Sequence, residues 1–450
     1  MTARPRLDDY RIILAYSGRV AIGLGAVYAV PLAVAALEGE WAAFVDLSIG
    51  CSASLALGAA LASLMPREAR PGWLHGMVAT AVSWLLAMFL AAIPYRLSGH
   101  YASWLDSLFD AMSGFTTTGL TLVQDLDHLS RALNTWRHVV TFVGGQGVVV
   151  LALSFLVGGS RGGYELYVGE AKDERLFPRV AHTAKAIWKI SAVYLAVGVG
   201  ALWVAGLSIG LPAKEAFYHG AWVYMAAWST GGFAPMSQNV GYYHSAVYEL
   251  VCVAFFLAGS LNFALHHALM TGNRRELARN AEVISFTVTF AGLFTLAAWA
   301  LAGSGTYGGI ATLLRKGFYH VISAHTTTGF MTVAARQFAR EWTPLALCAM
   351  ILAMMAGGSA CSTAGGVKGM RVAMLWLAIR NEVRALLLPS HASFRRRIHA
   401  SGDRDLGDGV VKGAALVALL YVATWVLATM AGVAAGYSPM DAAFEGASVT

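Results

Sequence analysis

The chain has 450 residues, of which 57 % are hydrophobic and 13 % charged, and its mean hydropathy is +0.58 with a net charge of +7. Because a soluble domain carries about 25 % charged residues, this composition excludes an ordinary soluble protein. The cysteines stand in apolar or Gly-rich surroundings without motif spacing, which indicates packing residues rather than disulfides or metal ligands. They are Cys51, Cys252, Cys348 and Cys361.

Long apolar runs follow one another along the chain. A membrane-spanning helix needs roughly 20 mostly apolar residues, so we predict an all-α polytopic protein of the lipid bilayer. The start, MTARPRLDDYR, leads straight into the first run, and we expect no cleavable signal. The runs cover residues 12–37, 47–65, 73–93, 139–157, 190–207, 248–265, 284–301, 345–355, 370–379 and 413–435.

A half-apolar segment, residues 101–115, follows the third run and is too short to cross a membrane. It ends in a Thr/Gly strand, and the polar stretch VQDLDHLSRALN then leads to the next full run. The same order recurs twice, at a period of about 100 residues, and such a period fixes the architecture. The three strands are Thr116-Thr117-Thr118-Gly119, Ser229-Thr230-Gly231-Gly232 and Thr326-Thr327-Thr328-Gly329.

A fourth unit begins with residues 413–435 and SPMDAAFEGASVT, where Glu445 aligns with Asp110 and Thr450 with Phe115. The printed sequence stops one residue before a fourth Thr/Gly strand, so we expect it to be an incomplete copy of a longer protein. The predicted divisions are a two-span extension (1–70), repeat 1 (71–160), repeat 2 (161–272), repeat 3 with a broken second helix (273–390) and the start of repeat 4 (391–450).

The repeated Thr/Gly strands fit a cation path. Non-helical backbone at membrane depth is tolerated only where protein buries it or where it lines a watery cavity. Around a pore, carbonyl and hydroxyl oxygens can replace the hydration shell of a metal cation. Glycine allows the backbone to turn its carbonyls inward, and the C-terminal end of each half-helix favours a cation. The alternative is that Thr and Gly mediate contacts between helices. This alternative is less favoured, because the pattern occurs three times and each copy follows a half-helix.

A second motif, AGGSACSTAGGVKGMR, interrupts the second long run of repeat 3. Its glycines should break the helix, since Gly costs roughly 1 kcal/mol against Ala there. We predict a flexible intramembrane loop that gates the pore; the alternative is a turn joining two short spans. Lys368 is expected nearer the loop and Arg371 nearer a partner interface. The candidate gating residues are Gly357, Gly358, Ser359, Gly365, Gly366, Lys368 and Arg371.

The positive charge is unevenly distributed. With the N-terminus inside, segments near residues 4–11, 67–70, 161–189, 274–279 and 368–412 face the cytoplasm and hold most of the 32 Lys and Arg. This asymmetry is the positive-inside rule, so the basic balance requires no nucleic acid. Arg19 and Arg137, near apolar runs, are expected to snorkel or pair.

The strands TTTGL, STGGF and TTTGF, together with GGSACSTAGGVKGMR, resemble the Trk/Ktr/HKT superfamily of potassium transporters. The two extra N-terminal runs and the stretches WRHVVTFVGGQGVVVLAL and ERLFPRVAHTAKAIWKI are similar to its bacterial TrkH branch. The resemblance covers residues from about 12 to 450.

This resemblance implies four span–pore-helix–span repeats around a central ion pore, with a selectivity filter near the outer face. It implies a homodimer with one pore per protomer, and a cytosolic nucleotide-binding regulatory subunit (TrkA-like) beneath. Glycine at 119, 232 and 329 matches the potassium-selective pattern of the family. Two departures stand out. The fourth strand and last span are missing. FYH also lies four residues farther from the glycine in repeat 2 than in repeat 3, which predicts imperfect filter symmetry.

We therefore expect potassium uptake across the cytoplasmic (inner) membrane, with the potassium ion as cofactor. The alternative is a sodium- or proton-coupled secondary transporter with re-entrant helices. A membrane enzyme is not expected, because the runs hold no nucleophile–base pair or metal-ligand set. The sequence leaves open whether flux is coupled or passive, and which nucleotide controls the regulatory subunit.

Overall fold

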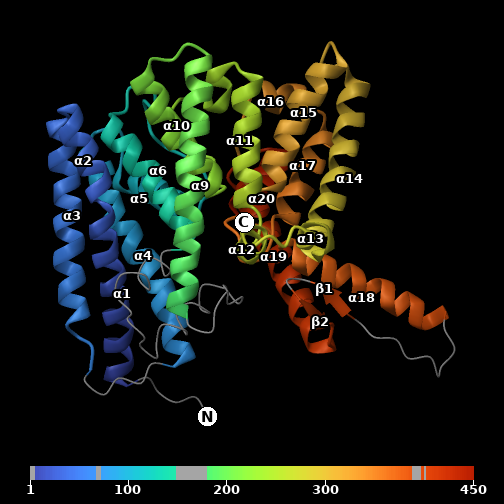
Figure 1. Cartoon of the computed structure of the whole chain (residues 1–450), viewed down its shortest axis with the longest axis horizontal. Helices are drawn as coiled ribbons and strands as arrows, with labels where there is room; N and C mark the ends of the chain where they lie inside the picture. Colours follow the sequence, from blue (N-terminus) through green and yellow to red (C-terminus); the bar gives the residue numbers. More distant parts are fainter. Residues whose placement is uncertain (1–5, 67–71, 148–179, 388–396, 400–401) are drawn as a thin grey trace. The chain divides into compact units, whose positions relative to one another are not determined.

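The structure is a computed structural model that describes residues 6–66, 72–147, 180–387, 397–399 and 402–450. The chain divides into two compact units, Met1–Tyr243 and His244–Thr450, which we call unit 1 and unit 2 (Figure 1). Both are built almost entirely of helices, as the sequence predicts.

Unit 1 contains long helices that pack side by side with shorter ones between them (Figure 1). Helix α5 is the half-apolar segment of repeat 1, and α10 is its counterpart in repeat 2. The elements are α1 (Leu7–Val27), α2 (Ala29–Glu38), α3 (Trp41–Ala62), α4 (Trp73–Leu97), α5 (Trp104–Phe115), α6 (Arg131–Gln146), α9 (Val180–Ser208), α10 (Ala213–Trp228) and the 3₁₀ helix η1 (Asn239–Tyr243).

Unit 2 holds the remainder of repeat 2, repeat 3 and the start of repeat 4. Helices α15 and α20 are the half-apolar segments of repeats 3 and 4. The elements are α11 (Ala246–Gly259), α12 (Phe263–Met270), α13 (Arg275–Arg279), α14 (Ala281–Ser304), α15 (Ile310–His325), α16 (Ala335–Glu341), α17 (Pro344–Ala356), α18 (Gly369–Leu387), β1 (Arg397–His399), β2 (Asp403–Asp405), α19 (Asp408–Ala434) and α20 (Pro439–Val449). The two short strands pair antiparallel.

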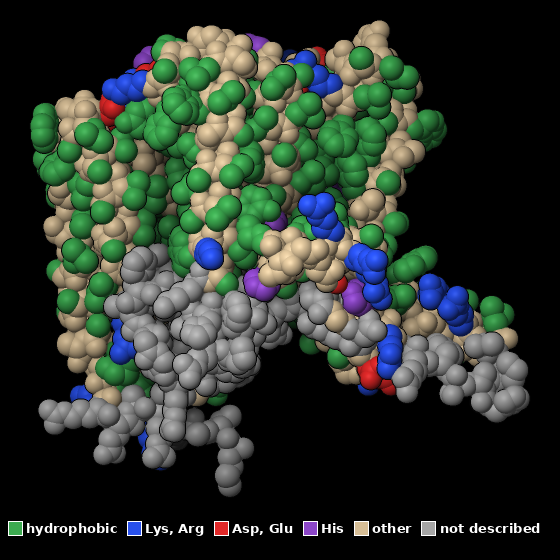
Figure 2. All heavy atoms as spheres, viewed as in Figure 1, with side chains coloured by type: hydrophobic (Ala, Val, Ile, Leu, Met, Phe, Trp, Pro, Cys, Tyr) green, Lys and Arg blue, Asp and Glu red, His purple; other side chains and the backbone are tan. Residues whose placement is uncertain are grey.

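Six helices among the described residues are long and apolar enough to cross a membrane. Hydrophobic side chains cover the sides of α9 and α14 (Figure 2), and Val288 and Trp299 on α14 are about two-thirds exposed, at 66 % and 69 %. Apolar side chains facing outward along a whole helix are typical of contact with lipid. The chain is therefore a multi-pass membrane protein.

One predicted span is wrong in its continuity. Residues 248–265 were expected to form a single helix, but the structure breaks them into α11 and α12, which meet at a bend of 104°. The polar residues Ser260 and Asn262 fall at the break, and the Asn262 side chain accepts a hydrogen bond from the N–H of Ala264. This is an N-cap, which starts a new helix instead of continuing the old one.

Some sequence expectations lie outside the described residues. The run 139–157 is described only as far as residue 147, where α6 has ended. The predicted cytoplasmic stretches at 67–70 and 161–179 are also outside, as are Arg395 and Arg396.

Candidate functional site

Each Thr/Gly strand follows directly on the end of a short helix: segment 1 (116–119) after α5, segment 2 (229–232) after α10 and segment 3 (326–329) after α15. All three share one backbone shape, with positive φ at the second and fourth positions. A β-branched residue at positive φ is rare and costs about 1–3 kcal/mol, and such strain gathers at functional sites. The φ angles are 56°, 50° and 55° at Thr117, Thr230 and Thr327, and 82°, 66° and 80° at Gly119, Gly232 and Gly329.

The N–H groups of the segments turn back onto the helix ends. The third residue of each segment donates to a carbonyl five residues earlier. With these donors engaged by the helix, carbonyl and hydroxyl oxygens are the polar groups that the segments offer to a cation. The bonds run from Thr118 to Ser113 at 2.9 Å, from Gly231 to Ala226 at 2.8 Å and from Thr328 to Ser323 at 2.8 Å.

Segments 1 and 3 are also held by side chains of their own short helix. Ser113 Oγ donates to Leu120 O at 2.6 Å, and Asp110 Oδ1 accepts from Leu122 N at 2.9 Å. In repeat 3, Ser323 Oγ donates to Phe330 O at 3.0 Å, and His320 Nε2 lies 3.4 Å from Thr332 N. The positions correspond between the repeats, so the sequence repeat encodes a repeated clamp.

Segment 2 keeps the backbone but not the side chains. Gly231 stands where segments 1 and 3 have threonine, and a Cβ there would lie 2.2 Å from Thr141 Oγ1 of α6. Helices α5, α10 and α15 all end four residues before the filter glycine. The expected imperfect symmetry is therefore absent from the backbone and appears in the side chains. Ser229 and Gly231 replace two threonines, and Ala226 stands where Ser113 and Ser323 hold the other two segments.

Segments 1 and 2 approach each other closely within unit 1. A Cβ on Gly119 would lie 2.4 Å from the carbonyl oxygen of Gly231, closer than any real contact. A Cβ on Gly329 would meet no described atom within 4 Å. Glycine at 119 is therefore required by both its φ and its neighbour.

Arg137 of α6 joins the chain beyond segment 1 to the chain beyond segment 2. Its fully buried guanidinium lies 3.5 Å from Asp110 Oδ2, 3.1 Å from Thr121 Oγ1 and 3.5 Å from Ala234 O. It also lies 4.5 Å from the centre of the Phe233 ring. The expectation that Arg137 pairs is confirmed, because removing a charge from water requires such partners.

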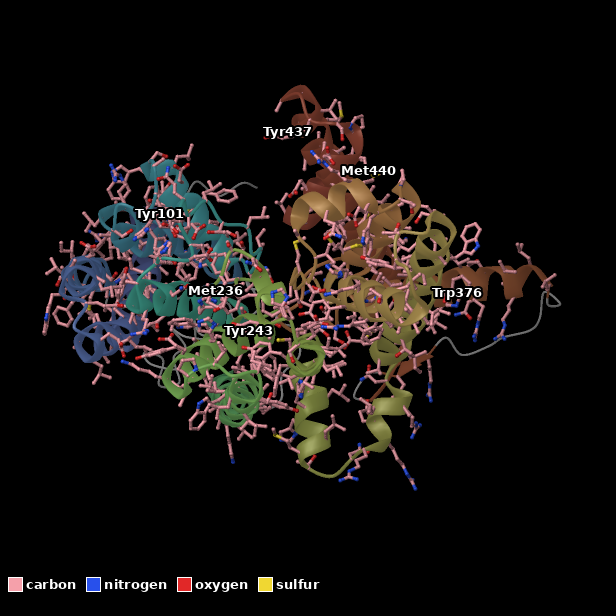
Figure 3. The ribbon with its side chains drawn as sticks, turned by 90° about the horizontal axis from the view of Figure 1, so that it is seen from above. Tyr101, Met236, Tyr243, Trp376, Tyr437 and Met440 are labelled. Carbon is pink, nitrogen blue, oxygen red and sulfur yellow. The ribbon has the colours of Figure 1, made fainter. Side chains whose placement is uncertain are left out.

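Sequence reasoning missed the partner, Asp110, although its alignment with Glu445 in the repeat was a signal. Tyr101 Oη donates to Asp110 Oδ2 at 2.8 Å, and Tyr101 lies among the teal helices of unit 1 in Figure 3. The buried carboxylate of Asp110 thus accepts hydrogen bonds from Tyr101, from Arg137 and from the N–H of Leu122, which lies beyond segment 1.

Unit 2 has an acid–base interaction in which the two helices exchange roles relative to Asp110 and Arg137 of unit 1. Here the acid is on the long helix, and the bases are on the short one. Glu249 of α11 accepts from Arg315 of α15 at 2.7 and 2.8 Å, and Lys316 Nζ lies 3.4 Å from Glu249 and 2.9 Å from Thr332 O. Because Thr332 follows segment 3, this pair also anchors the chain just beyond a Thr/Gly segment.

The polar stretch after segment 1 carries exposed charges. His128 Nδ1 lies 3.0 Å from Asp125 Oδ1. Their hydrogen bond raises the pKa of His128 and lowers the pKa of Asp125. Asp127 accepts from the N–H and the hydroxyl of Ser237, both at 2.7 Å, which ties this stretch to the chain that follows segment 2.

The predicted helix breaker forms a loop between α17 and α18, residues 357–368, which we call the Gly-rich loop. Its two ends cross at a narrow neck, because a Cβ on Gly357 would lie 2.1 Å from Gly365 O. Gly357 and Gly366 both have positive φ, at 70° and 81°. The loop contacts segment 3 directly, since Gly365 N donates to Thr327 Oγ1 at 2.7 Å.

The basic residues after the loop fold back onto it. Lys368 has φ of 80°, and its ammonium donates to Ala364 O. Arg371 Nη1 donates to Val367 O at 3.1 Å. Both side chains thus reach carbonyls of the Gly-rich loop.

Comparison with known proteins agrees with this architecture. A family model described as TrkH, cation transport protein, matches residues 47–448. The Trk system potassium uptake protein TrkH of Halomonas elongata is 30 % identical over 390 residues, which are 84 % of this chain and 77 % of that protein. An uncharacterized cation transporter of Methanocaldococcus jannaschii is 29 % identical over 377 residues, covering 84 % and 73 %.

The fold has a solved counterpart. The crystal structure of the potassium transporter TrkH from Vibrio parahaemolyticus superposes with a TM-score of 0.80 at 24 % sequence identity, covering 98 % of this chain and 89 % of that one. The repeated arrangement of spans and short helices is therefore a known membrane fold.

Proposed function

Because this chain belongs to the TrkH family of cation transport proteins, we propose that it takes up potassium across the cytoplasmic membrane, with its N-terminus in the cytoplasm. The observation that carries the proposal is the shared backbone of segments 1, 2 and 3, with a strained Thr and a left-handed Gly in each. Potassium is the transported ion, and the proposal includes no enzymatic reaction.

We assign the three segments to a selectivity filter. The N–H groups of the first three residues in each segment are bound to the helix ends. This supports a role for the segment oxygens in replacing the water shell of a cation. The short helices end at the segments, so the negative ends of their dipoles favour positive charge there. The filter residues are Thr116, Thr117, Thr118, Gly119, Ser229, Thr230, Gly231, Gly232, Thr326, Thr327, Thr328 and Gly329.

We assign the Gly-rich loop to the gate. Its contact with Thr327 supports a closed position against segment 3. The ammonium of Lys368, bonded to the loop, would oppose cation entry if it lies near the ion path, since two charges about 4 Å apart repel by roughly 4 kcal/mol at an effective dielectric of 20. The gating residues are Gly357, Gly358, Ser359, Gly365, Gly366, Lys368 and Arg371.

The division into repeats and the partners belong to the same proposal. The repeats occupy residues 71–160, 161–272, 273–390 and 391–450, after a two-span extension, 1–70. Relatives named as Trk system proteins support cooperation with other Trk components, which we propose to be a second copy of this chain and a cytosolic nucleotide-binding regulatory subunit. Nucleic acid has no role in the proposal.

The test is ion uptake by the purified protein in proteoliposomes under a clamped membrane potential. We expect rubidium, a potassium substitute, to enter down its electrochemical gradient and to exceed sodium under matched conditions. A strict requirement for a sodium or proton gradient would instead support the coupled secondary transporter.

A further inference from the structure

The break between α11 and α12 has its own set of partners in unit 2. Helix α11 ends at Gly259 and α12 begins at Phe263, which frees carbonyl and N–H groups inside an apolar stretch. Unsatisfied backbone groups at membrane depth cost several kcal/mol each. The bonds that the Gly-rich loop makes to these groups show why the break is tolerated.

The Gly-rich loop supplies those bonds. Ser359 N donates to Ser260 O at 2.9 Å, and Thr363 Oγ1 donates to Gly259 O at 2.8 Å. In the other direction, Phe263 N donates to Cys361 O at 3.4 Å. The two helix breaks thus satisfy each other's backbone hydrogen-bonding groups. If the loop leaves its position, groups at both breaks lose these partners.

A single buried carboxylate connects the same two segments. Glu282 lies in the first turn of α14 and is 1 % exposed. Its Oε1 accepts from Ala360 N of the Gly-rich loop at 2.7 Å, and its Oε2 accepts from Asn262 Nδ2 at 3.3 Å. Hydrogen bonds to a charged acceptor are stronger than those between neutral groups. The N-terminal end of α14 also favours negative charge.

The loop packs tightly at this point. A Cβ on Gly358 would lie 2.5 Å from Ala364 Cβ and 3.0 Å from Ser260 O, and Gly369 N donates to Gly358 O at 2.8 Å. Because the backbone is close on both sides, a small displacement of the loop breaks several contacts together. We therefore expect the Gly-rich loop to switch between two discrete positions, rather than to move gradually from one to the other.

We propose that Glu282 is a latch that holds the Gly-rich loop closed by binding Ala360 and Asn262 at once. It is a positioning residue, because it acts on the ion path only through the loop. The break between α11 and α12 is accordingly the place where the closed loop is bound. The inference rests on the proposed gating role of the Gly-rich loop.

The test compares Glu282→Gln with the matched control Glu382→Gln, since Glu382 is exposed on α18. The variants are reconstituted without the regulatory subunit, and rubidium uptake is measured. Glutamine retains the volume of the side chain but loses the charge and one acceptor, so we expect basal uptake to rise roughly tenfold, which corresponds to about 1.4 kcal/mol. The rubidium-to-sodium ratio should change far less than uptake, because the segments keep their own hydrogen bonds to the helix ends and release only the bond from Gly365 N to Thr327 Oγ1.

A second readout follows the loop itself. Cys361 is in the Gly-rich loop and partly exposed, so its thiol reports movement when Cys51, Cys252 and Cys348 are replaced by alanine. We expect Glu282→Gln to increase the rate of Cys361 modification by a cytoplasmic maleimide. Faster modification is not expected from a change that merely alters the filter.

Asn262→Asp tests the bond between Glu282 and Asn262, and it provides a second test of the latch if Glu282→Gln does not fold. Aspartate preserves the acceptor that caps α12 but replaces the donor to Glu282 with a second carboxylate. The lost bond and the repulsion between like charges both favour release of the loop, so at least the same rise in basal uptake is expected. If deleting part of the Gly-rich loop raises uptake but neither latch variant does, the latch is refuted and the gate stands. If the deletion also has no effect, the gating proposal itself fails.

Discussion

Replacing Gly119 by serine places a side chain between two segments of the proposed filter. Gly119 has φ of 82°, and its Cβ would lie 2.4 Å from Gly231 O. Ordinary van der Waals contacts of a Cβ begin near 3.4 Å, so the two segments must separate by about 1 Å at this point. The carbonyl of Gly231, which we assign to the ion path, is the group that moves.

The energetic cost of Gly119→Ser has two parts. A left-handed conformation costs an L-residue roughly 1–2 kcal/mol, and overpacking adds typically about 1–3 kcal/mol. A fold near 5–15 kcal/mol of stability tolerates this, so we expect assembled protein. If about 1.4 kcal/mol of the strain is relieved differently around potassium and sodium, their flux ratio changes about tenfold.

The assay is rubidium and sodium uptake in proteoliposomes for Gly119→Ser, with Gly329→Ser and Gly210→Ser beside it. Gly329 and Gly210 have φ of 80° and 89°, and neither Cβ would meet a described atom within 4 Å. We expect selectivity to fall most in Gly119→Ser and to be unchanged in Gly210→Ser, which lies in a turn outside the segments. Equal losses at 119 and 329 would attribute the effect to φ alone, and an unchanged ratio at 119 would refute its role in the filter.

Three further predictions concern other parts of the chain. Arg137→Ala should lower the free energy of unfolding by about 3–5 kcal/mol by leaving the buried Asp110 without its positively charged partner. The double variant with Asp110→Ala should cost less than the sum of the single changes in thermal unfolding, whereas strict additivity would mean that the two do not interact. Cysteine at position 127 should be labelled only from outside and cysteine at 397 only from inside; the reverse pattern would overturn the proposed orientation. Deleting several residues of the Gly-rich loop should raise uptake without the regulatory subunit, and unchanged uptake in folded protein would return the loop to a simple turn.

Much of the fold was predictable because each element depends on local composition. Apolar runs of roughly 20 residues must form helices in lipid, where every backbone group needs an internal partner. The three Thr/Gly strands were found by their repetition, and the Gly-rich loop by its glycines between two apolar runs. The break at residues 260–262 was missed, although Ser260 and Asn262 inside an apolar run were a signal.

The sequence by itself thus determined a multi-pass helical protein with repeated Thr/Gly segments and an interrupted helix, since periodicity, apolar length and glycine content act over short distances. Only the tertiary structure showed that the carbonyl of Gly231 leaves no room for a Cβ at Gly119, that Arg137 reaches Asp110 and Ala234, and that Glu282 joins Ala360 to Asn262. Partners far apart in the chain are selected by packing and by the cost of burying an unpaired charge, and neither quantity can be read from neighbouring residues.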